Sequence, residues 1–111
     1  MEKINFVKKV DLLQKTVKDF IGKKLKTNSF LQKYEELYSY LFLENENYTL
    51  NHISEDEAGI FDEIHAEINL FEPNINYRKE HPSYIDEEQL RKNIRSILQK
   101  VKNHKWWIIS K

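Results

Sequence analysis

The sequence predicts an all-α fold: a compact antiparallel four-helix bundle with one long loop before the last helix. Glycine and proline, which tight turns consume, occur only twice each in 111 residues. Four separate segments carry apolar residues at helical spacings of three and four. A long stretch without a sustained period, residues 72–85, contains both prolines. The length suits a single domain over residues 1–111.

The first two helices are predicted from their apolar stripes. The first stripe consists of Phe6, Val10, Leu13, Val17, Phe20 and Ile21. Gly22 and the lysines that follow mark the end of this helix, where positive charge suits the helix dipole. A second helix is expected to start at residues 27–29, with a stripe formed by Phe30, Tyr34, Leu37, Tyr38, Leu41 and Phe42. Residues 44–49 indicate a polar loop.

Two capping patterns predict the starts of the remaining helices. Ser54 with Glu57 predicts a helix from about Glu55 to Pro73, and Asp86 with Gln89 predicts the last helix. The third stripe is Ala58, Phe61, Ile64, His65, Ile68 and Phe71, and the fourth is Leu90, Ile94, Ile97, Leu98 and Val101. The apolar tail, residues 104–109, is expected to form a short strand or a strap across the bundle.

Several classes of function are disfavoured. The chain has no cysteine, which excludes disulfides and thiol catalysis. The four histidines do not share the helical spacing of metal ligands, and no glycine-rich phosphate loop is present. We therefore expect no enzyme, no metal and no cofactor. Without an apolar run that could cross a bilayer or a secretory signal, the expected location is the cytoplasm.

The charge is distributed unevenly although it sums to zero. Residues 34–76 contain eleven acids and no Lys or Arg, whereas the flanking segments are basic. On a helix, Asp56, Glu63 and Glu67 fall within an arc of roughly 40°. Ile60 and Leu70 flank this arc, away from the core stripe. This pattern favours an outward interface for a basic partner. The alternative is a solvated helix face that pairs with the chain's own lysines.

Three short blocks in the second half carry a resemblance to a known family. They are Phe71-Glu72-Pro73, Tyr84-Ile85-Asp86 with Leu90, and Arg95-Ser96-Ile97-Leu98. Together with residues 12–37, they resemble the colicin D immunity protein family, the colicin-like bacterial self-protection proteins. The resemblance implies a non-catalytic four-helix inhibitor that binds the tRNase domain of a bacteriocin or a contact-dependent growth inhibition toxin. Such inhibitors present acids to the basic active-site cleft of the toxin.

The residues expected to bind the toxin lie between the third helix and the long loop. Glu63, Glu67 and Glu72 are expected to make the direct charge contacts, Asp56 and Asp62 to assist, and Tyr77 and Arg78 to close the rim. Asn69 and Asn74 complete the set, at positions where the colicin D inhibitor has acids. The expected partner is a nuclease domain, with no nucleic acid or membrane bound directly, and the chain is expected to be a monomer. The alternative is a nucleic-acid-binding module that uses the lysine-rich first helix.

Overall fold

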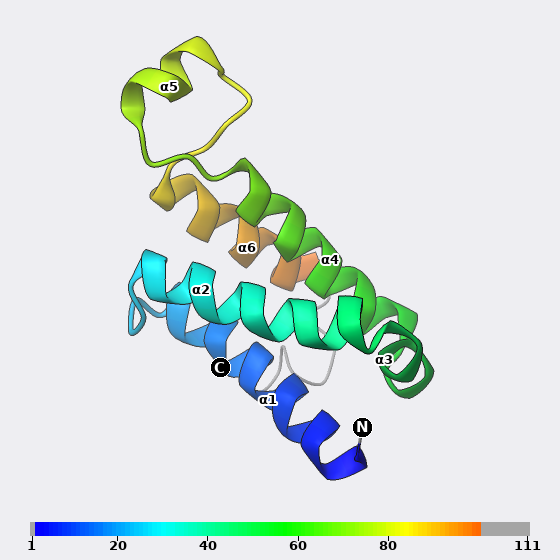
Figure 1. Cartoon of the computed structure of the whole chain (residues 1–111). Coiled ribbons are helices and arrows are strands. Elements are labelled where there is room, and N and C mark those ends of the chain that lie inside the picture. Colours follow the sequence, from blue (N-terminus) through cyan, green and yellow to red (C-terminus); the bar gives the residue numbers. More distant parts are fainter. Residues whose placement is uncertain (1, 101–111) are drawn as a thin grey trace. The chain divides into compact units, whose positions relative to one another are not determined.

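The computed structural model describes residues 2–100, and the regular elements in this range are all helical (Figure 1). They are α1 (Lys3–Ile21), α2 (Thr27–Tyr38), the π-helix η1 (Ser39–Glu44), α3 (Glu46–His52), α4 (Glu55–Leu70), α5 (Ile75–Glu80) and α6 (Glu87–Lys100). The all-α prediction is therefore confirmed. The antiparallel four-helix arrangement stays a prediction. Val101 and the tail at residues 104–109 lie outside the described residues.

The chain divides into two compact units, Met1–Gly59 and Ile60–Lys111, and each is described by itself. The first unit contains α1, α2, η1, α3 and the start of α4. The second contains the rest of α4, together with α5 and α6. A single domain over residues 1–111 stays a prediction.

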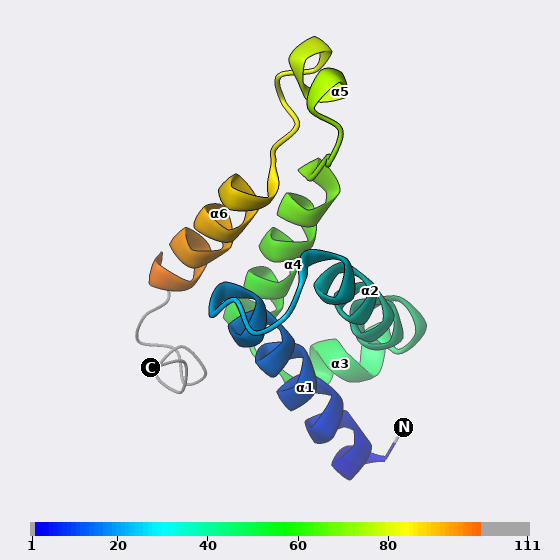
Figure 2. The ribbon, with the colours of Figure 1, turned by 90° about the vertical axis from the view of Figure 1, so that its left-hand side faces the viewer.

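The first unit is built on α1 and α2, which lie side by side (Figures 1 and 2). The predicted stripe of α1 is confirmed: five of its members are buried and Ile21 is half-buried. α1 ends at Ile21 with Gly22 as its C-cap, and Gly22 was predicted to mark this end. The residue with a left-handed backbone is the next one, Lys23, at φ 61°.

Aromatic rings connect these helices to η1. Phe20 of α1 stacks on Phe30 of α2, with ring centroids 4.0 Å apart and planes 6° apart. Phe30 contacts Tyr34, Tyr34 stacks on Tyr38, and Tyr38 stacks on Phe42. The stripe predicted for residues 30–42 is therefore correct, because α2 continues directly into η1.

The polar loop predicted over residues 44–49 is wrong, because η1 ends at Glu44 and α3 begins at Glu46. Carbonyl groups at the end of a helix need donors. Asn45 Nδ2 donates to the Tyr40 carbonyl at 2.8 Å, and the buried Thr49 Oγ1 donates to the Leu41 carbonyl at 2.6 Å. Polar residues that suggested a loop therefore stabilise the end of η1.

The second unit pairs α4 with α6, which lie side by side (Figures 1 and 2). Its buried side chains are Ile60, Phe61, Ile64 and Ile68 from α4 and Leu90, Ile94, Ile97 and Leu98 from α6. The predicted cap of α6 is present, since Asp86 Oδ1 accepts from the Gln89 N–H at 2.8 Å. In the first unit, Ser54 Oγ accepts from the Glu57 N–H at 3.1 Å and caps α4.

The outward position predicted for Ile60 is wrong. Ile60 is only 2% exposed, whereas Leu70 is 36% exposed. At 100° per residue, the buried residues from Ile60 to Ile68 occupy an arc of roughly 100°, with Ile60 at one edge. The side of α4 that faces the core therefore includes Ile60, which the predicted stripe left out. Phe71, which the predicted stripe included, is only half-buried.

The long loop predicted before the last helix contains the short helix α5. Its two ends meet, because the Glu72 N–H donates to the Ile85 carbonyl at 2.9 Å and the Ile85 N–H donates to the Leu70 carbonyl at 2.8 Å. Phe71 and Ile85 form an isolated parallel β-bridge. We call residues 71–85 the α5 loop; it extends beyond the adjoining ends of α4 and α6 (Figure 1). No helix of the described part is long and apolar enough to cross a membrane.

Candidate functional site

The outward side of α4 in the second unit is acidic. Asp62, Glu63, Asn69 and Leu70 are exposed there, and with the small residue Ala66 they span an arc of roughly 120°, opposite the buried isoleucines. The whole helix contains six acids and no Lys or Arg. A helix face of this composition creates a negative potential that favours a cationic partner.

Glu63 is the most available carboxylate of this face. It makes no hydrogen bond or ion pair with any other residue between positions 2 and 100. Asp62 is exposed as well but has an interaction partner. Two intramolecular ion pairs, Lys15–Asp19 and Arg91–Glu87, each lie within one helix and outside residues 34–76. Glu63 is therefore not neutralised by the part of the chain that the structure describes.

Glu67 differs from Glu63, because it is half-buried and bonded within the unit. Its Oε1 accepts from Asn93 Nδ2 of α6 at 2.7 Å, and Asn93 Oδ1 accepts from Gln89 Nε2 at 2.6 Å. This chain of hydrogen bonds ties α4 to α6. Glu67 therefore has a structural role in addition to any contact with a partner.

Four of the predicted site residues lie together in the α5 loop: Glu72, Asn74, Tyr77 and Arg78. The Glu72 carboxylate accepts from the Asn74 N–H at 3.0 Å, and Asn74 Oδ1 accepts from the Tyr77 N–H at 3.0 Å. Asn74 is thus the N-cap of α5. Arg78, half-buried, donates from a guanidinium nitrogen to the Glu72 carbonyl at 2.5 Å. These contacts hold α5 against Glu72 and Asn74, the residues that lead into it.

Beside the predicted Tyr77, the α5 loop presents Ile75 and His81, which were not among the predicted site residues. Ile75 is 58% exposed, and the Tyr77 ring, 41% exposed, stacks on His81 with centroids 4.2 Å apart. The spacing of Tyr77 and His81 by four residues, directly after a capping Asn74, was a usable signal for a short helix with paired rings.

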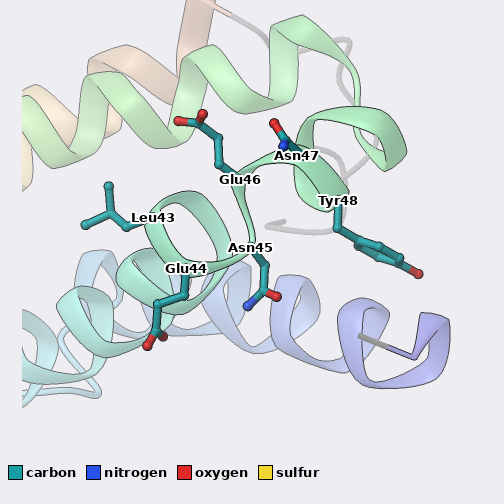
Figure 3. Close-up of a pocket in the computed structure, with 6 residues that line it drawn as sticks. All are labelled: Leu43, Glu44, Asn45, Glu46, Asn47 and Tyr48. Carbon is teal, nitrogen blue, oxygen red and sulfur yellow. The ribbon is translucent and has the colours of Figure 1, made fainter.

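The remaining predicted residue, Asp56, lies in the first unit, exposed in the first turn of α4. That unit also has a shallow depression of about 410 Å³ between η1 and α3 (Figure 3). Its lining is one continuous stretch, Leu43, Glu44, Asn45, Glu46, Asn47 and Tyr48. None of the predicted site residues lines it. Among the described residues, no group of three or more His, Asp or Glu side chains could hold a metal ion.

The second unit thus presents an acidic helix face that is followed by a loop with exposed rings. A family model for bacterial self-protective colicin-like immunity proteins matches residues 9–101. This range covers most of the 111 residues, and the chain belongs to that family. No match was found among curated proteins or among solved structures.

Membership defines the general activity. Proteins of this family are immunity proteins, which bind a cognate toxin and inhibit it, and they are generally not enzymes. The predicted resemblance to the colicin-like immunity proteins is thereby confirmed.

Proposed function

We propose that this immunity protein inhibits a nuclease toxin, specifically a tRNase, by presenting the acidic face of α4 to the active-site cleft of the toxin. The observation that carries the proposal is the exposed Glu63 carboxylate, which has no partner in residues 2–100, on a helix without Lys or Arg. Family membership supports a toxin as the partner. The charge supports a basic cleft on that toxin.

The physical reason lies in what a ribonuclease must bind. RNA carries one negative charge per nucleotide, so its binding cleft needs positive charge. Carboxylates on a rigid helix compete for the same charges and also accelerate the encounter. We place this encounter in the cytoplasm, where tRNA is, and expect one copy of the chain, acting as a single domain, per toxin domain.

Within the surface, we propose Asp62, Glu63 and Glu72 as the charge contacts. Glu67 and Arg78 contribute by holding the surface in shape, because both are bonded within the unit. The other proposed contacts are Asp56, Asn69, Asn74 and Tyr77. The asparagines supply hydrogen bonds rather than charge, which suits a partner different from colicin D.

Charge reversal at Glu63 tests the proposal. The variant is Glu63→Lys, and its matched control is Asp11→Lys, which makes the same change at an exposed acid of α1. The binding partner in the assay is the nuclease domain of the cognate toxin. At low salt, Glu63→Lys should slow association at least ~10-fold because steering dominates association rates, and the loss should shrink in ~0.5 M salt. Asp11→Lys should associate like the wild type.

Two results would contradict the proposal. Equal association rates for Glu63→Lys and the wild type would show that the acidic face of α4 is not part of the interface. A cognate toxin that does not cleave tRNA would refute the tRNase as the target of inhibition. Direct binding of RNA by this chain at low salt would instead favour the nucleic-acid-binding alternative.

A further inference from the structure

The α5 loop is ordered without a core of its own. None of the residues of α5 is buried. Its shape instead rests on local polar bonds: the Asn74 cap, the bond from Arg78 to the Glu72 carbonyl, and the paired backbone at Glu72 and Ile85. Compact surface loops whose ends are close and whose shape comes from their own residues are frequently functional. The order of this loop therefore serves something outside the core.

The loop uses this order to present a cluster of rings. The Tyr77 and His81 rings stack with planes 29° apart, and Tyr84 meets both, at 5.6 Å from Tyr77 and 6.3 Å from His81. Ile75, at 58% exposure, lies on the same short helix. Rigid aromatic side chains lose little conformational entropy on binding, so they are effective anchors in protein interfaces.

The ring cluster directly follows the acidic face in the chain. Glu63 lies seven residues before the end of α4 at Leu70, which is roughly 10 Å along the helix axis at 1.5 Å per residue. A partner surface that receives the carboxylates of α4 therefore continues toward the α5 loop. In RNA, negative phosphates and flat bases alternate over similarly short distances, and proteins bind single-stranded RNA by pairing basic grooves with stacking surfaces.

We propose that the ring cluster of the α5 loop, formed by Tyr77, His81 and Tyr84, is the apolar anchor of the complex and occupies the nucleobase-stacking surface of the nuclease. This inference rests on the proposed function and deepens it. The carboxylates of α4 take the place of phosphates and set the rate of association. The rings take the place of bases and set the rate of dissociation. Arg78 is a positioning residue that holds α5 against Glu72, rather than a contact at the rim.

The first test compares Tyr77→Ala with Tyr77→Phe, using the full chain and the nuclease domain of the cognate toxin. Tyr77→Ala should raise the dissociation rate at least ~10-fold, as expected for an aromatic anchor, with association within about twofold of the wild type. The loss should persist in ~0.5 M salt, because ring contacts are not screened. Tyr77→Phe keeps the ring and should dissociate like the wild type. Urea unfolding should be unchanged in both variants.

The second test separates positioning from contact at Arg78. Arg78→Ala removes the donor to the Glu72 carbonyl, whereas Arg78→Gln removes the charge but keeps an N–H donor. Arg78→Ala should raise the dissociation rate and accelerate amide hydrogen exchange in α5. Arg78→Gln should have a dissociation rate and an exchange rate in α5 that are closer to those of the wild type. Loss of binding in both variants, with exchange in α5 unchanged, would make Arg78 a charge contact and overturn its positioning role.

The third test concerns the nucleobase surface. The inhibitor and a 2′-O-methyl RNA oligonucleotide, which resists cleavage, should bind the toxin domain in a mutually exclusive manner. Simultaneous binding would overturn the inference, as would a wild-type dissociation rate for Tyr77→Ala. If Tyr77→Ala behaves like the wild type while Glu63→Lys associates slowly, the anchor is refuted and the proposed function stands. If the wild-type chain does not inhibit RNA cleavage by the toxin, the proposed function itself fails.

Discussion

Truncating two aliphatic residues of α4, Ile60 and Leu70, should lower the stability of the protein by very different amounts. Ile60 is 2% exposed and Leu70 is 36% exposed, although both side chains contain four carbons. Ile60→Ala removes three buried carbons, worth about 0.8 kcal/mol each, and leaves a cavity. The better helix propensity of alanine returns about 0.4 kcal/mol. We expect Ile60→Ala to lower the free energy of unfolding by about 3 kcal/mol and Leu70→Ala by about 1 kcal/mol or less.

Urea unfolding followed by circular dichroism at 222 nm measures both changes. The slope with urea should stay the same while the midpoint falls, which indicates a change in stability rather than in the unfolded state. Equal losses in the two variants, within about 0.5 kcal/mol, would refute the assignment of Ile60 to the core. Toxin binding should show the reverse order: Leu70→Ala should weaken it, whereas Ile60→Ala should leave the folded fraction binding normally.

Three further predictions concern local structure. Lys23→Gly should raise the free energy of unfolding by about 0.5–1 kcal/mol, because glycine removes the cost of the left-handed backbone at this position. The control, Lys24→Gly, should give no gain in stability, and thermal unfolding measures both variants. Asp86→Ala should cost about 1 kcal/mol through loss of the α6 cap, again measured in urea, and no change would rule out capping. Glu67→Ala and Asn93→Ala each remove the hydrogen bond from Asn93 Nδ2 to Glu67 Oε1 and should be non-additive in a double-mutant cycle, with a coupling of at least about 0.5 kcal/mol. Additive losses would contradict the bond between them.

The sequence predicted those elements that are long enough to show a period. The stripes of α1 and α2, and the α6 stripe as far as Leu98, were correct because each repeats over three or more turns with polar residues on the opposite side. The caps by Ser54 and Asp86 were correct because a single side chain decides each of them.

The orientation of α4 was harder to predict, because its apolar residues surround more of the helix. Ile60, Leu70 and Phe71 stand close together on the helical wheel, and sequence alone does not say which of them turns inward. In the structure Ile60 turns inward, and Glu67, its neighbour on the wheel, becomes half-buried and bonds to Asn93.

The shortest elements were missed for a different reason. α3 has seven residues and α5 has six, which is less than the window over which a period can be recognised. η1 was missed because hydrogen bonds, rather than side-chain pattern, distinguish a π-helix from an α-helix. Within the candidate site, the charge pattern of the sequence predicted the acids on α4. It did not predict the hydrogen bond from Arg78 to the Glu72 carbonyl, because that bond depends on how the α5 loop folds.

The α5 loop is closed at its base, where Phe71 pairs with Ile85, and this closure affects how such a protein can evolve. Because Phe71 and Ile85 pair at this base, and because none of the residues of α5 is buried, substitutions between them cost the helices little. When a bacterium meets an altered toxin, substitutions in the α5 loop can therefore change the specificity of the inhibitor without unfolding it. We expect related immunity genes to diverge fastest between Phe71 and Ile85 and slowest at the isoleucines of α4.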